Sequence, residues 1–151
     1  MIYTDETWTV YWEKAERALE EARYLQNACF FDGAYIRALG SCLQAAAAVS
    51  LRLKRERDPT DYVPRLWQFF RDGRLPDTLA HPFGEILKAH ADELPTSLSH
   101  DAEDGRQAIQ LAENFQRAMV AAADLSTSHY SHEVMQAAAA RGISMPPAPF
   151  R

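Results

Sequence analysis

The chain has 151 residues, with 16 basic and 21 acidic side chains and a formal net charge of −5. This length suits one domain with a single core, and the negative charge disfavours general DNA binding because it repels phosphates at long range. Alanine occurs 25 times against ten valines and isoleucines together, which favours an all-α fold because small side chains lose little rotamer freedom in a helix.

The first two helices are predicted by the spacing of apolar residues. Steps of three and four residues place one set on a single face: Trp8, Trp12, Ala15, Leu19, Ala22, Leu25 and Cys29. Asp32 is a suitable N-cap for a second helix, which we expect to run to about Arg57, before Asp58-Pro59. The alanines at 45–48 would let neighbouring helices approach this one closely, or they only supply helix propensity. We expect this helix to be central.

Three further main helices follow. The third is predicted over residues 61–72, and the fourth begins between Pro76 and Pro82 and ends at Pro95. The fifth carries its apolar stripe from Ala108 to Leu125. A short helix is expected over residues 131–140, before an irregular, Pro-rich tail. We therefore divide the chain into a helical bundle over residues 1–128 and a short helix with tail over 129–151.

Nothing in the sequence predicts a secreted, membrane-bound or cofactor-dependent protein. The N-terminus is acidic rather than signal-like, and no apolar run approaches the roughly 20 residues that cross a bilayer. The di-iron and zinc-protease spacings and a Gly-rich phosphate loop are all absent. We expect a cytoplasmic protein with no membrane contact, no cofactor and no metal, and we do not take His129 and His132 as ligands.

Two groups of side chains could have a functional role, but a structural interpretation explains each of them better. Cys29 and Cys42 lie in apolar helical segments, so we interpret both as reduced core residues. Glu13, Glu16 and Glu20 share one helix face, which could hold a divalent metal but is better explained as a solvated face.

A run of basic residues ends the second predicted helix: Arg52, Lys54, Arg55 and Arg57. Positive side chains there interact favourably with the helix dipole. The functional alternative adds Arg65, Arg71 and Arg74 and forms a local anion-binding or RNA-binding patch on an acidic protein. We take Arg37, Arg52, Arg55 and Arg74 as the candidate binding residues.

Four segments resemble motifs of the HEPN superfamily, the helical domains of prokaryotic RNase toxins and of proteins found beside minimal nucleotidyltransferases. Residues 31–38 resemble its Gly-x-Tyr-x-x-Ala opening of the second helix, and 43–49 its alanine-rich continuation. Residues 72–79 resemble the loop entering the next helix, and 102–115 the final Ala-x-x-Ala-x-x-Phe pattern. The resemblance implies an up-and-down bundle that forms a homodimer and has a nucleotidyltransferase or antitoxin as a partner.

HEPN ribonucleases carry an arginine followed, after about four to six residues, by a histidine, and the pair acts on RNA across the dimer interface. The corresponding segment here begins with Lys88 and His90 and ends with Glu93. Lysine lacks the planar fork that suits phosphate, and a carboxylate at 93 would repel the phosphodiester. Arg74 and His81 have the literal spacing, but the flanking prolines place them at a loop and a helix start, so we regard that match as accidental.

The resemblance therefore implies a HEPN-like module that has lost catalysis and serves in interaction or substrate binding, with RNA as a further candidate partner. The alternative is a metal-independent endoribonuclease that uses Lys88 with His90 or His100, since imidazoles titrate near neutral pH.

Overall fold

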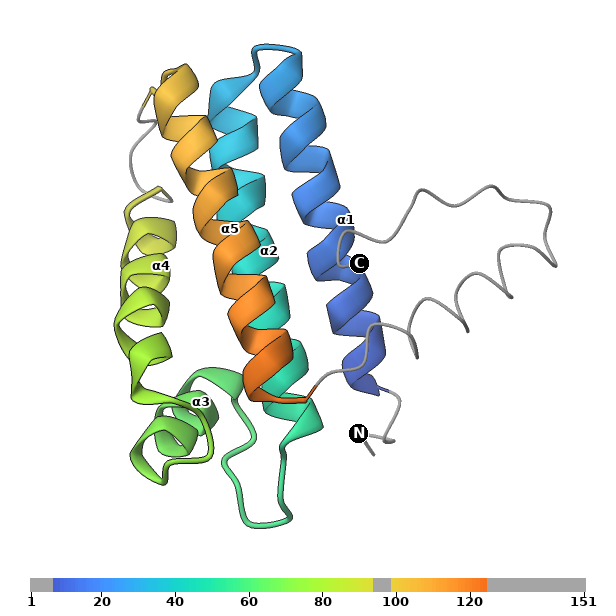
Figure 1. The fold of residues 1–151 in the computed structure, drawn as a ribbon, viewed down its shortest axis with the longest axis vertical. Coiled ribbons are helices and arrows are strands. Elements are labelled where there is room, and N and C mark those ends of the chain that lie inside the picture. The colour runs from blue at the N-terminus through green and yellow to red at the C-terminus, as the bar shows by residue number, and fades with distance from the viewer. Residues whose placement is uncertain (1–6, 94–98, 125–151) are drawn as a thin grey trace, which may run out of the picture.

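The protein is an all-α bundle in a computed structural model that describes residues 7–93 and 99–124. Its elements are α1 (Thr7–Asn27), α2 (Phe31–Arg52), α3 (Tyr62–Arg71), the 3₁₀ turn η1 (Asp77–Leu79), α4 (Ala80–Glu93) and α5 (Ala102–Ala122). Successive long helices α1, α2, α4 and α5 alternate in direction, while short α3 lies across the end of the bundle (Figure 1). The predicted five helices are confirmed, whereas the short helix at 131–140, the tail and the boundary at 128 lie outside the described residues.

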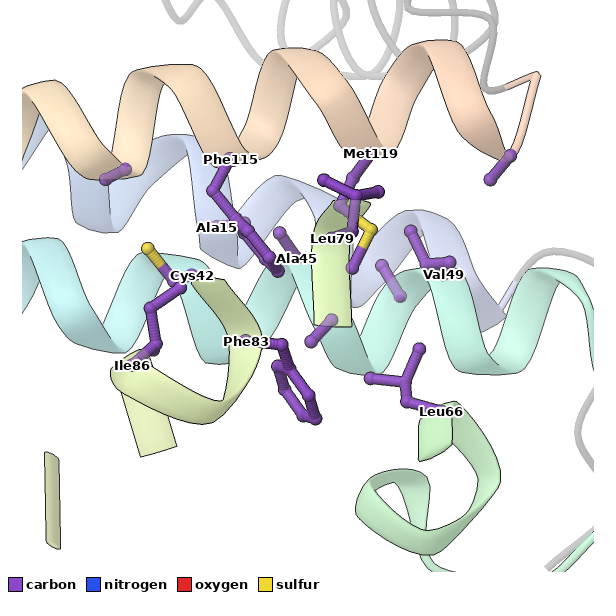
Figure 2. Close-up of a cluster of buried hydrophobic side chains, with 14 of the residues drawn as sticks. Ala15, Cys42, Ala45, Val49, Leu66, Leu79, Phe83, Ile86, Phe115 and Met119 are labelled. Carbon is purple, nitrogen blue, oxygen red and sulfur yellow. The ribbon is translucent and has the colours of Figure 1, made fainter. Parts of the chain in front are cut away.

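Helix α2 is the centre of the bundle, as expected, because it contacts each of the other helices. Its inward side consists of small residues, including Ala38, Cys42, Ala45 and Ala46, all with no exposed surface. Larger side chains from the surrounding helices fill the space beside them, such as Phe83 from α4 and Phe115 from α5 (Figure 2). Burial of Cys42 confirms one cysteine prediction.

The turn between α1 and α2 corrects two predictions. Cys29 is exposed and has a positive φ of 65°, and the amides of Cys29 and Phe30 donate to the carbonyls of Gln26 and Leu25. These bonds form a Schellman motif, in which Cys29 occupies the left-handed position that usually holds glycine. Asp32 is not the N-cap, because α2 already begins at Phe31. Its carboxylate instead accepts a bond from the backbone amide of His100, 2.6 Å away.

Helix α2 ends at Arg52, well before the predicted end at Arg57. The Asp58 carboxylate accepts a hydrogen bond from the Arg55 amide at 2.6 Å, and the Asp58 amide donates back to the Arg55 carbonyl at 3.0 Å. This local turn engages the Arg55 and Asp58 backbone groups that a continued helix would use. Only Arg52 of the predicted basic run therefore lies on the helix.

Contrary to the expectation that no segment could span a bilayer, α2 could cross a membrane by length and composition, and it is the one helix of the described ranges that could. Most of its apolar stretch is buried inside the bundle, as in the core helix of a water-exposed domain. The cytoplasmic placement remains a prediction.

Candidate functional site

A groove of about 440 Å³ lies where α2 meets the start of α3, with contributions from α1 and α4. Its volume is within the usual range for small-molecule sites. Its more polar walls are formed by six side chains, Tyr11, Gln44, Asp61, Tyr62, Arg65 and His90. Because these come from α1, α2, α4 and the start of α3, the groove exists only in the folded bundle.

Arg65 lines this groove and is only 1% exposed. Its Nε donates to the Pro59 carbonyl at 2.8 Å, and its Nη2 donates to the Thr60 carbonyl at 2.6 Å. Its Nη1 donates to the Ser50 hydroxyl on α2 at 3.2 Å. The guanidinium thus fastens the loop before α3 to α2. The alternative in which Arg65 joins a surface patch is wrong, because helix packing buries this side chain.

Two further wall residues, Gln44 and Tyr62, contribute polar atoms. The Oε1 atom of Gln44 is buried, and within the described ranges it accepts no hydrogen bond. Tyr62 is partly buried, and this burial raises the pKa of its phenol. Neither residue was singled out from the sequence. Gln44 carries a signal in hindsight, since it interrupts the apolar, alanine-rich stretch of the central helix.

Within one chain, the residues of the alternative catalytic site do not lie together. His90 lies in the groove, whereas Lys88 is exposed and is not among the lining residues. Two residues apart on one helix, their side chains point to different faces. Glu93 is the last residue of α4.

His100 belongs to a separate cluster at the start of α5. Its ring stacks on Tyr35 with centroids 3.7 Å apart and an interplanar angle of 12°. Its Nδ1 lies 3.7 Å from the carboxylate of Asp104, and its side chain is 10% exposed. This packing joins the start of α5 to α2, and His100 does not line the groove.

The four candidate binding arginines occupy two ends of the bundle. Arg37 forms an ion pair with Glu21 of α1, and it lies about 22 Å along the helix from Arg52, at 1.5 Å per residue. Arg52 packs near the Trp8 ring at 5.9 Å, and Arg55 is exposed in the following loop. These positions do not place Arg37 in one patch with the others.

Arg74 stabilises the loop that follows α2 by bonding to groups within it. One Nη donates to the Leu53 carbonyl at the end of α2, and the other lies 3.2 Å from the Asp58 carboxylate. The guanidinium carbon lies 4.1 Å from the centroid of the Phe69 ring. His81, its literal motif partner, is an exposed residue in the first turn of α4.

Glu16 departs from the predicted solvated acidic face. It is 4% exposed, and its Oε1 atom accepts no hydrogen bond from the described part of the chain. Burial raises its pKa from 4.5 to about 7, the neighbouring Trp12 indole partly opposes this rise, and Glu13 and Glu20 add to it by repulsion. Across residues 7–93 and 99–124, no group of three or more acidic, histidine or cysteine side chains is placed to hold a metal ion.

In comparisons with known proteins, no family model, curated protein or solved structure matches this chain.

Proposed function

We propose that this protein is a non-catalytic, HEPN-like binding module whose binding site is the groove between α2, α3 and α4. The observation that carries the proposal is the hydrogen bonding of the guanidinium that lines the groove. Arg65 is the arginine in the groove, and its three nitrogens already donate to Pro59, Thr60 and Ser50. The motif resemblance described above supports the HEPN-like part of the proposal.

RNA cleavage of the HEPN type needs a cation on the phosphate beside an imidazole that moves a proton. His90 meets the second requirement by position, but Lys88 is exposed outside the groove walls. This groove holds one imidazole and one guanidinium that is already hydrogen-bonded to the protein. It is therefore better suited to binding a ligand than to stabilising the pentacoordinate phosphorus of a cleavage transition state.

The HEPN resemblance also supports a homodimer that works with a nucleotidyltransferase or with a toxin-antitoxin partner. Light scattering of the purified chain tests the first part of this proposal. A monomer at tens of micromolar would contradict the homodimer.

The decisive experiment for the catalytic question is incubation of the protein with structured and single-stranded RNA. We expect no cleavage by the native chain, by Lys88→Ala or by His90→Ala. The matched control is His81→Ala, which removes an imidazole that is exposed outside the groove. Cleavage that is lost in the first two variants and kept in the control would establish the endoribonuclease alternative.

A further inference from the structure

One face of α2 is open along the groove. Four residues at steps of four, three and four lie on this side of the helix: Ile36, Gly40, Leu43 and Ala47. The side chain of Ile36 is 44% exposed, and the other three residues line the groove. Within the described ranges, a Cβ atom built on Gly40 would meet nothing within 4 Å. The groove is therefore part of an open and largely apolar helix face.

This face has no net charge, unlike the chain as a whole. Arg65 and Asp61 are the charged residues that line the groove, one of each sign, whereas the chain carries a formal charge of −5 with histidine neutral. Two copies of an acidic protein repel each other at long range. They approach with least repulsion through a neutral face, and an apolar centre beside polar residues such as Tyr11 and Tyr62 is typical of protein interfaces.

The order of large and small residues makes this face complementary to itself. Ile36 and Gly40 are four residues apart, and so are Leu43 and Ala47. An antiparallel pairing of two α2 helices that sets Leu43 over the partner's Gly40 therefore also sets Ile36 over the partner's Ala47. Each large side chain then enters the space beside a small residue, and two-fold symmetry repeats both contacts.

The extent of the face suits a stable dimer. From Ile36 to Leu51 it is about 22 Å long at 1.5 Å per residue. Helices α1 and α4 also contribute to the groove, and packed helices lie about 9 Å apart, so three of them present about 600 Å² from each copy. The two copies together would bury about 1,200 Å², which is the lower end of the range for specific interfaces.

We propose that the groove is the interface of a homodimer, in which α2 of one copy packs antiparallel against α2 of a second copy with Leu43 over Gly40. This inference rests on the proposed function, because it names a second copy of this chain as the partner that the groove binds.

Analytical ultracentrifugation of the full chain and of Gly40→Leu tests the interface. The new side chain enters space that is open in a single copy, and leucine favours a helix more than glycine does. Circular dichroism should therefore show unchanged helicity. In the dimer this leucine collides with the partner's Leu43, so we expect the dimer dissociation constant to rise about a hundredfold. The matched control Ala121→Leu, at an exposed position of α5 outside the groove, should leave it unchanged.

A second variant tests which residues oppose each other. Leu43→Ala alone removes the side chain that fills the space beside Gly40, and it should weaken the dimer about tenfold to a hundredfold because each dimer loses two such contacts. In the double variant Gly40→Leu with Leu43→Ala, each new leucine faces a new alanine. We expect this double variant to dimerise at least about tenfold more tightly than Gly40→Leu alone.

A dimer that Gly40→Leu does not weaken, or a double variant no tighter than that single one, overturns the inference and leaves a homodimer formed through another face. A native chain that is monomeric at tens of micromolar overturns the inference and the homodimer together, while the groove can still bind other molecules. RNA cleavage that depends on His90 would instead remove the non-catalytic function and would not change the dimer measurements.

Discussion

Replacing Glu16 by glutamine should stabilise this protein progressively more as pH rises. The carboxyl is 4% exposed, and burial raises its pKa from 4.5 to about 7. In the unfolded chain the same group loses its proton near the ordinary value of 4.5. Between these two values the folded state binds more protons, so the stability of the native protein falls as pH increases.

The magnitude follows from the two pKa values. One pKa unit corresponds to about 1.36 kcal/mol, so a rise from 4.5 to about 7 makes ionised Glu16 cost the fold about 3 kcal/mol. This penalty is absent below pH 4.5, grows between pH 4.5 and 7, and is complete above about pH 7. A neutral glutamine never ionises, and any cost of burying its amide is the same at every pH.

Urea unfolding followed by tryptophan fluorescence measures this effect. The quantity of interest is the free energy of unfolding of Glu16→Gln minus that of the native chain, at pH 4, 6 and 8. We expect this difference to increase by about 3 kcal/mol from the lowest pH to the highest. The control is Glu85→Gln on the exposed side of α4, for which the difference should vary by less than about 0.5 kcal/mol.

A difference that stays flat for Glu16→Gln would refute the reasoning. It would mean that the Glu16 carboxylate reaches solvent or a cation when it ionises, and that the α1 face carrying it is as open as the sequence suggested.

Three other outcomes follow from the structure. Arg65→Lys should lower the free energy of unfolding by about 2–4 kcal/mol in urea titrations, because one ammonium cannot reach all three acceptors on Pro59, Thr60 and Ser50. Unchanged stability would contradict the fastening role of Arg65. Cys29→Gly should raise stability by about 1 kcal/mol, because φ is 65° at this position, and a lower melting temperature would count against it. In the native protein a thiol reagent should modify exposed Cys29 but not Cys42, since burial raises the Cys42 thiol pKa to about 12; mass spectrometry of the labelled chain decides this.

The helices themselves could be predicted because each buries one apolar stripe. The spacing from Trp8 to Ala22 predicts α1, and these residues do line the core. The small residues of α2 likewise predict a central position, which the packing confirms. The end of α2 was misjudged because the turn there depends on a hydrogen bond from a backbone amide to the Asp58 side chain. Such turns and a continued helix differ by only a small free energy per residue, so the sequence does not decide between them.

Sequence alone determined which faces of the helices are apolar, and it named His90 as a residue of interest. It could not determine depth: Glu16 and Arg65 look like surface residues, yet both are almost completely buried. Their burial depends on how closely neighbouring helices pack over them, which periodicity along one helix does not encode. The groove is likewise a product of the tertiary structure, because its walls join Tyr11, Gln44 and His90 from three helices that only packing brings side by side.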